Sequence, residues 1–159
     1  GPLSRYYDLI MDMATFGYYT RFIKKVVSWM DIQENDQIVD LGSGTGRNTC
    51  LMADYLKNNG KIVGLDIGEE MIAQFRKKCR SRHNVRVLKQ RIDEPFELPE
   101  SFDKALLCFV LHGFPFEVQK TILNNCFEAL HTDGCLFIVD YSEFSIESLP
   151  WFQRILFKL

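Results

Sequence analysis

The stretch that decides the fold runs from Asp40 to Gly46 and reads Asp-Leu-Gly-Ser-Gly-Thr-Gly, directly after the apolar pair Ile38-Val39. Three glycines at alternate positions allow the backbone to turn sharply and to approach a ligand closely, because no Cβ stands in the way. The pattern predicts the end of a buried strand, a glycine turn and the start of a helix, whose free N–H groups favour an anionic ligand group. We therefore expect a nucleotide-like cofactor with an anionic group to bind here.

The spacing of these glycines argues against a dinucleotide. The dinucleotide fingerprint is G-x-G-x-x-G, and Gly42 and Gly44 supply only its first two glycines, because Arg47 stands at the third position. An arginine there obstructs the close helix–strand packing that the third glycine permits. The motif present is instead an acidic residue followed by G-x-G-x-G.

A second acidic residue ends the next predicted strand. The run Lys-Ile-Val-Gly-Leu-Asp at 61–66 is apolar in its middle and ends at Asp66, which follows Asp40 by 26 residues. A carboxylate at this strand tip is placed to accept hydrogen bonds from both ribose hydroxyls of an adenosine. The two motifs together predict one binding site at one edge of a sheet.

The two motifs resemble those of the class I S-adenosylmethionine (SAM) methyltransferases. The second motif of that family typically reads G-x-D-x-S-x-x-M, and Gly64, Asp66 and Met71 match it, with Gly68 in place of the serine. The resemblance implies SAM as cofactor and S-adenosylhomocysteine (SAH) as product. It also implies that the glycine turn holds the methionine part, Asp66 the ribose, and Met71 one side of the adenine, while Ile92 offers its backbone N–H to the base.

Within that superfamily, the chain is most similar to the ubiquinone/menaquinone C-methyltransferases. Tyr6-Tyr7-Asp8 and Phe16-Gly17 resemble their N-terminal Y-D…G segment, the stretch at 129–134 stands where they have L-K-P-G-G, and Asp140-Tyr141-Ser142 resembles their E-F-S. The chain departs from the group after the fourth strand. There it carries Leu-His-Gly-Phe at 111–114 in place of an arginine–asparagine pair.

Strands and helices alternate along the chain, which predicts an α/β fold: a Rossmann-like, doubly wound, mostly parallel sheet. We expect one SAM-binding methyltransferase domain over 1–159, with N-terminal helices in 4–30, a core at 36–141 and a C-terminal helix at 146–158. Strands are predicted at 37–41, 61–66, 85–89, 104–110 and 135–141, and helices at 5–13, 19–30, 47–58, 69–80, 116–130 and 146–157.

The family topology has two further strands beside the fifth, and no sequence follows Leu159 to form them. We therefore expect the chain to be truncated after the fifth strand. The bare apolar edge of that strand is then a pairing liability. A second copy, another partner or the final helix is expected to cover it.

The predicted site residues lie after the carboxyl ends of these strands or in an N-terminal lid. Those expected to bind the cofactor are Asp40, Gly42, Ser43, Gly44, Gly46, Asp66, Ile67, Met71, Ile92, Asp93 and Phe109. Those expected at the acceptor are Tyr6, Tyr7 and His112, and the candidate catalytic residues are His112, Asp140 and Tyr141. Imidazole titrates near neutral pH, so His112 is the leading candidate for a general base. The alternative for His112 is a loop cap, for Asp140 and Tyr141 it is a structural role, and for Tyr6 and Tyr7 it is aromatic packing.

These features favour an enzyme of the methyltransferase class that acts on a small, apolar or aromatic acceptor by C- or O-methylation. The net charge of −2 gives no global basic field for nucleic acid, and aromatic residues make up 13% of the chain. Two alternatives stay open. The basic stretch at 76–82 admits an RNA or protein methyltransferase, and the bare strand edge admits a non-catalytic SAM-binding scaffold.

Five cysteines, an odd number without a C-x-x-C pair, predict free buried thiols in a reducing cytoplasm. The sequence shows no signal peptide and no apolar run of membrane-spanning length. Clusters of His, Asp, Glu and Cys at metal-ligand spacing are also missing, so no metal is expected. The predicted location is the cytoplasm, and the predicted partner is a small-molecule substrate.

Overall fold

The computed structural model describes residues 18–57, 59–96, 98 and 101–140. The helices predicted at 5–13 and 146–157 lie outside these residues. So do the predicted site residues Tyr6, Tyr7 and Tyr141.

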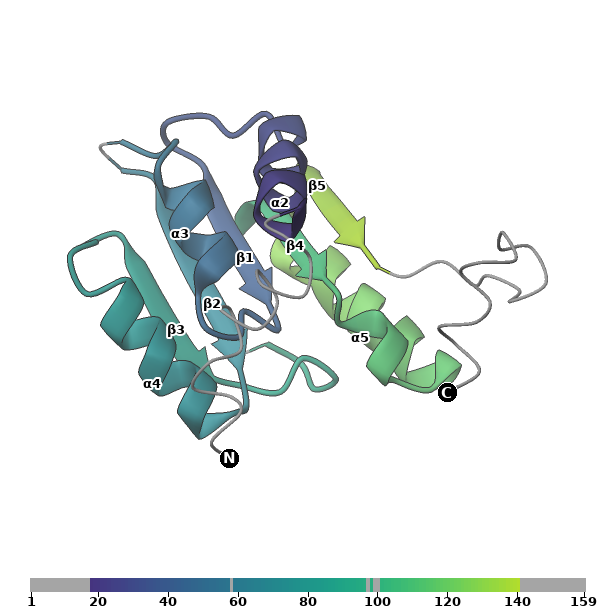
Figure 1. Ribbon diagram of the computed structural model, residues 1–159. Helices are drawn as coiled ribbons and strands as arrows, with labels where there is room; N and C mark the ends of the chain where they lie inside the picture. The colour runs from purple at the N-terminus through teal and green to yellow at the C-terminus, as the bar shows by residue number, and fades with distance from the viewer. Residues whose placement is uncertain (1–17, 58, 97, 99–100, 141–159) are drawn as a thin grey trace, which may run out of the picture.

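The described residues form a five-stranded parallel sheet in the order β3-β2-β1-β4-β5, as Figure 1 shows. Its strands are β1 (Gln37–Leu41), β2 (Lys61–Asp66), β3 (Val85–Lys89), β4 (Phe102–Cys108) and β5 (Leu130–Val139). The strand order reverses direction at β1, so the chain crosses from one half of the sheet to the other between β3 and β4. This topology confirms the predicted α/β, Rossmann-like fold, and it makes the carboxyl ends of β1 and β4 the expected ligand position.

Helices cover both faces of the sheet because alternate residues of each strand point to opposite faces. The helices are α2 (Tyr18–Trp29), α3 (Arg47–Ala53), α4 (Glu69–Lys78) and α5 (Phe116–Ala129), with a 3₁₀ turn, η2, at Leu111–Gly113. Ile38 joins the core formed with α2 and α3, whereas its neighbour Val39 joins the core formed with α5. No helix among the described residues combines the length and the apolar character needed to cross a membrane.

The structure places three strands where the sequence predicts them and shifts the other two. β4 ends at Cys108 rather than at residue 110, because Phe109 has a φ of 57° and the left-handed region cannot continue a strand. β5 begins at Leu130, paired with Phe102, and its regular pairing with β4 resumes at Cys135 after a register shift. The helix predicted to reach residue 58 ends at Ala53, after which Lys57 donates its backbone N–H to the Glu34 carbonyl.

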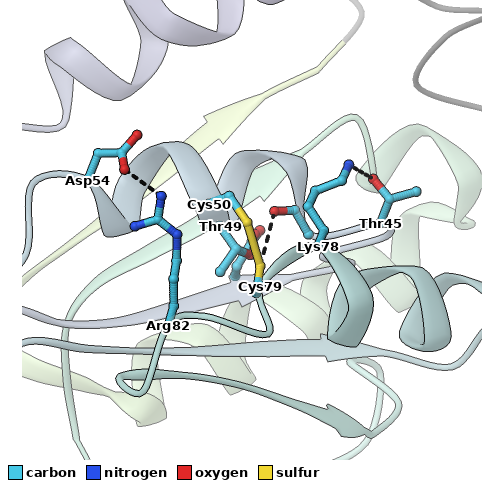
Figure 2. Close-up of a disulfide and its surroundings, with 9 residues drawn as sticks. Thr45, Thr49, Cys50, Asp54, Lys78, Cys79 and Arg82 are labelled. Atoms are coloured by element: carbon cyan, nitrogen blue, oxygen red, sulfur yellow. Dashed lines mark hydrogen bonds and ion pairs between the residues drawn. A yellow bond between two sulfur atoms is a disulfide. The ribbon is translucent and has the colours of Figure 1, made fainter.

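The prediction of five free thiols is wrong, because a disulfide joins Cys50 in α3 to Cys79 at the C-terminal end of α4 (Figure 2). The two Cα atoms lie 6.3 Å apart, within the range that a disulfide spans. The pair is separated by 29 residues, so only the side-by-side packing of α3 and α4 reveals it. Cys108, Cys126 and Cys135 are free, and Cys135 is exposed rather than buried.

Candidate cofactor and active site

The glycine turn is fixed by hydrogen bonds to the end of β2. The backbone N–H groups of Gly42 and Ser43 both donate to the Leu65 carbonyl at 2.9 Å, and the N–H of Gly44 donates to Asp66 Oδ2 at 2.8 Å. Gly42 and Gly44 have φ angles of 70° and 53°, a conformation that side chains rarely adopt. The two sequence motifs thus form one hydrogen-bonded unit at the carboxyl edge of the sheet.

Asp66 is the central anion of this unit. Besides its bond from Gly44, the carboxylate accepts the N–H of Gly68 at Oδ1, at 2.7 Å. A carboxylate offers about four acceptor positions, so each oxygen can accept a further hydrogen bond from a ligand hydroxyl.

An apolar cavity of about 220 Å³ lies on one side of Asp66. Ile92 forms a buried part of its wall, whereas Ile67 is 58% exposed at its rim. Asp93 pairs with Arg91 at 2.5 Å, and this bond holds the pKa of the Asp93 carboxyl below its usual range. The residues that line this apolar cavity are Gly42, Leu65, Asp66, Ile67, Gln90, Arg91, Ile92, Asp93, Val110 and Phe114. A flat apolar ring system with a polar edge suits such a cavity.

A second, more polar cavity of about 260 Å³ shares Gly42 and Asp66 with the first. Phe109, in its left-handed conformation, lines it beside Tyr19 of α2, with ring centroids 5.9 Å apart. The lining residues are Tyr19, Gly42, Ser43, Gly44, Thr45, Arg47, Asn48, Asp66, Met71, Cys108 and Phe109. Met71, which the sequence predicts at the adenine, thus lines the polar cavity and not the apolar one. The two cavities therefore lie on either side of Gly42 and Asp66.

The polar cavity fits the nucleoside cofactor that the sequence implies. A Cβ added to Gly44 would meet no protein atom within 4 Å, so the backbone here faces open space that a ligand can approach. Ser43 Oγ and Asn48 Oδ1 are buried without a hydrogen-bond partner. Buried polar atoms in proteins are normally hydrogen-bonded, and Asn48 lines this cavity, so its oxygen suits a polar group of a ligand.

A histidine–carboxylate pair stands where β4 and β5 end. His112 Nδ1 lies 2.7 Å from Asp140 Oδ1, and the backbone N–H of His112 donates to Asp140 Oδ2 at 3.1 Å. The side chains are 46% and 14% exposed, respectively. An ionised carboxylate only accepts hydrogen bonds, so Asp140 places the proton of a neutral imidazole on Nδ1 and its lone pair on Nε2.

The comparison with known proteins agrees with this geometry. A family model described as a methyltransferase domain matches residues 38–134. The chain belongs to this family. It is 31% identical over 145 residues to the ubiquinone/menaquinone biosynthesis C-methyltransferase UbiE of Wigglesworthia glossinidia brevipalpis, covering 89% of this chain and 57% of that protein. It is 27% identical over 158 residues to the demethylmenaquinone methyltransferase of Listeria welshimeri, covering 96% of this chain and 64% of that protein.

The fold of the methyltransferase domain is also found in a solved structure. A SAM-dependent methyltransferase from Aquifex aeolicus superimposes with a TM-score of 0.68 at 22% identity, over 80% of this chain and 68% of that one. The family model and the relatives confirm the predicted methyltransferase family, and this structure confirms the predicted fold. The chain spans between 57% and 64% of the length of the two curated relatives.

Two predicted cofactor residues of the methyltransferase domain lie behind the site. Asp40 is buried and accepts the Thr49 hydroxyl at 2.5 Å, and neither cavity is lined by it. Burial, and secondarily the nearby Asp66, raises the pKa of Asp40 to about 6, although the Thr49 bond lowers it. Gly46 likewise lines neither cavity, and its α-carbon faces the Phe75 ring, which an added Cβ would approach to 2.7 Å.

The sequence interpretation missed Arg47 and Asn48. It read Arg47 only as a residue that excludes a dinucleotide, whereas the structure places both side chains in the wall of the polar cavity. The available signal was their position directly after Gly46, at the start of α3.

Proposed function

We propose that this methyltransferase domain binds SAM along the carboxyl edge of the sheet and transfers its methyl group to a small apolar or aromatic acceptor. The observation that carries the proposal is the pair of cavities joined at Asp66, one apolar and one polar. SAM has the same division: an adenine ring at one end, an amino acid at the other and a ribose between them.

The two cavities and the junction each suit one part of the cofactor. The apolar cavity with buried Ile92 suits the adenine, the carboxylate of Asp66 suits the ribose hydroxyls, and the polar cavity beside Gly44 suits the methionine part. SAM, when bound, supplies a methyl group activated by a sulfonium leaving group. The protein then has to orient the acceptor and manage its proton.

His112 and Asp140 are the residues proposed to manage that proton. With Nδ1–H bonded to Asp140, the Nε2 lone pair of His112 can take a proton from an acceptor hydroxyl or activated carbon acid. The curated relatives are named as methyltransferases of ubiquinone and menaquinone biosynthesis and of demethylmenaquinone. We therefore propose a hydroxylated aromatic acceptor, such as a quinol or phenol. The cytoplasmic location stays a prediction.

The cofactor part of the proposal is tested by calorimetric titration with SAM and SAH. Asp66→Asn removes the charge that receives the ribose hydroxyls, and we expect it to weaken SAH binding by about tenfold or more. Asp54→Asn is the matched control, because Asp54 is an exposed carboxylate paired with Arg82 outside both cavities. A folded wild-type protein that binds neither SAM nor SAH would contradict the proposal.

The catalytic part is tested by SAH release against a panel of quinols, phenols and lipids. His112→Gln is expected to lower kcat by about 100-fold or more while SAH affinity is unchanged. Asp140→Asn is expected to act in the same direction by disturbing the His112 tautomer. His83→Gln is the control, since His83 lines a separate cavity with Val85 of β3. Full activity of His112→Gln would show that this histidine is a loop cap.

A further inference from the structure

Arg47 is the cationic residue in the wall of the polar cavity. The other lining residues in the described part of the chain are neutral, except for the carboxylate of Asp66. Asp66 lines both the polar and the apolar cavity, whereas Arg47 lines only the polar cavity. The polar cavity is therefore charged at two points: negative where it meets the apolar cavity and positive at Arg47.

The Arg47 side chain is held in place by α2. Its guanidinium lies over the Tyr19 ring, 4.8 Å from the centroid, and donates a hydrogen bond to Thr20 Oγ1. Stacking and hydrogen bonding restrict a side chain that otherwise loses much rotamer entropy on binding. A guanidinium ordered in this way is suited to bind a carboxylate, because its N–H groups match the two carboxylate oxygens.

Asn48, the next residue, offers the opposite chemistry. Its Oδ1 is buried in the cavity wall without a hydrogen-bond partner. An amide oxygen accepts hydrogen bonds and donates none, so it calls for a donor such as an ammonium group. Arg47 and Asn48 together thus offer a cation and an acceptor, which are the partners that the two charged groups of an α-amino acid need.

We infer that Arg47 binds the α-carboxylate of the cofactor's methionine part and that the Asn48 amide oxygen accepts a hydrogen bond from its α-ammonium group. This inference rests on the proposed function, which supplies the cofactor. The reverse orientation would place the two charged groups of the methionine part in the apolar cavity, where burying charge is costly. Arg47 and Asn48 are therefore positioning residues that fix which end of the cofactor enters the polar cavity.

The inference is tested with three ligands that share the adenosine part. SAH carries both charged groups, decarboxylated SAH keeps only the ammonium group, and 5′-methylthioadenosine has neither. We expect Arg47→Gln to weaken SAH binding by about 10- to 100-fold and to leave the affinities for the other two ligands unchanged. We expect Asn48→Ala to weaken SAH and decarboxylated SAH alike and to leave 5′-methylthioadenosine unchanged.

Two control variants separate direct binding from indirect effects. Arg82→Gln removes an arginine that pairs with Asp54 outside the cavity, and all three affinities should stay at the wild-type value. Thr20→Val removes the hydroxyl that Arg47 donates to, and SAH affinity should fall by less than about threefold.

Three results with the variants would overturn the inference alone. Arg47→Gln could weaken all three ligands equally, which would mean a general loss of the fold of the site. Thr20→Val could reproduce the whole loss, which would mean that Arg47 acts through α2. Arg47→Gln could also bind SAH like the wild type. If the wild-type protein bound none of the three ligands, the proposed cofactor itself would fall, and the inference with it.

Discussion

Asp40 is a buried carboxylate whose ionisation opposes folding. Burial raises its pKa to about 6 from an ordinary value of 3.8, so between these values the folded state holds a proton that the unfolded state has released. The stability gained from the neutral group is complete below about pH 4 and is lost as the pH rises through 6, an amount of roughly 2–3 kcal/mol.

Replacing Asp40 by Asn should therefore stabilise the protein at neutral pH. The amide oxygen can still accept the Thr49 hydroxyl, while the cost of burying a charge disappears. We expect the free energy of unfolding to exceed that of the wild type by roughly 1–3 kcal/mol at pH 7 and by little at pH 4. Urea denaturation at four pH values between 4 and 7 measures this difference. A difference that does not change with pH would contradict the raised pKa.

A substitution at Gly44 is expected to affect cofactor binding and protein stability for different reasons. An alanine there would keep a φ of 53°, which costs about 1–2 kcal/mol, but its methyl group would touch no protein atom. The methyl group would instead occupy the polar cavity, so we expect Gly44→Ala to weaken SAH binding by roughly tenfold or more. Thermal denaturation and SAH titration measure the two effects separately.

Gly113 provides the matched control for this substitution. It is also surrounded by open space, it lies in the 3₁₀ turn with no left-handed φ, and it lines neither cavity. Gly113→Ala should change neither stability nor SAH affinity. If Gly44→Ala bound SAH like the wild type, the ligand would not approach the backbone at this glycine.

At the scale of elements, local patterns in the sequence predict the sheet well. β1, β2 and β3 have the predicted bounds. β1 and β2 are apolar in their middle, whereas β3 combines apolar and basic residues, and each strand lies between turn residues. The end of β4 escapes prediction, since the left-handed Phe109 beside Tyr19 is set by contacts between distant segments. The disulfide between Cys50 and Cys79 escapes prediction for the same reason, because its two cysteines are 29 residues apart in sequence.

The residues of the candidate site fall into the same two groups: those with a local signal in the sequence and those whose place depends on the folded structure. The glycine turn and Asp66 could be found because their spacing is local, and the structure joins them by a hydrogen bond. Arg47 and Asn48 could not be assigned, because the glycine pattern says nothing of which way the first side chains of α3 point. Asp40 is predicted at the cofactor but is buried in the structure, because an acidic residue at a strand end gives the same sequence pattern whether it faces a ligand or the core.

The disulfide should make the α3–α4 pair a major source of stability. A cross-link that closes a loop of 29 residues is expected to contribute about 3–4 kcal/mol by restricting the unfolded chain. Reduction should lower the free energy of unfolding by this amount. Guanidinium denaturation with and without a phosphine reductant measures it, and the effect of the reductant should vanish in Cys50→Ala.

Thiol counting gives an independent check on this prediction. Under denaturing, non-reducing conditions a thiol reagent should titrate the free Cys108, Cys126 and Cys135, and not Cys50 or Cys79. Cys135→Ser should remove one titratable thiol without changing the effect of the reductant. Titration of all five cysteines would show that the pair is reduced in the isolated protein.

At the scale of the whole molecule, the strand order assembles the site. His112 and Asp140 are 28 residues apart in sequence, and they meet because β4 and β5 are neighbouring parallel strands whose carboxyl ends lie at the same edge. The glycine turn after β1 reaches the same edge next to β4. Each part of the proposed chemistry therefore follows a different strand, and the parallel sheet brings these strand ends to one edge, although His112 and Asp140 line neither cavity.

The distribution of charge over the molecule bears on the RNA alternative. Arg76, Lys77 and Lys78 form the last turn of α4, where cations favour the negative end of the helix dipole. Lys78 also donates to the Thr45 hydroxyl at 3.1 Å, and Arg82 pairs with Asp54 at 2.5 Å. Part of the basic stretch is thus engaged within the protein, and the net charge of the chain is −2.

We therefore expect no salt-dependent binding of bulk tRNA by this chain, and no effect of charge reversal at the end of α4 on methyl transfer. The double variant Arg76→Glu, Lys77→Glu should keep the wild-type SAH affinity, because both side chains are exposed and lie outside both cavities. Filter binding at low and moderate salt measures RNA retention, with the double variant Lys24→Glu, Lys25→Glu on α2 as a control of equal charge. A phosphate-binding surface would show a steep fall in affinity with salt, lost only on reversal at α4. That pattern would move the acceptor from a small aromatic molecule to RNA, while leaving the cofactor site where the two cavities place it.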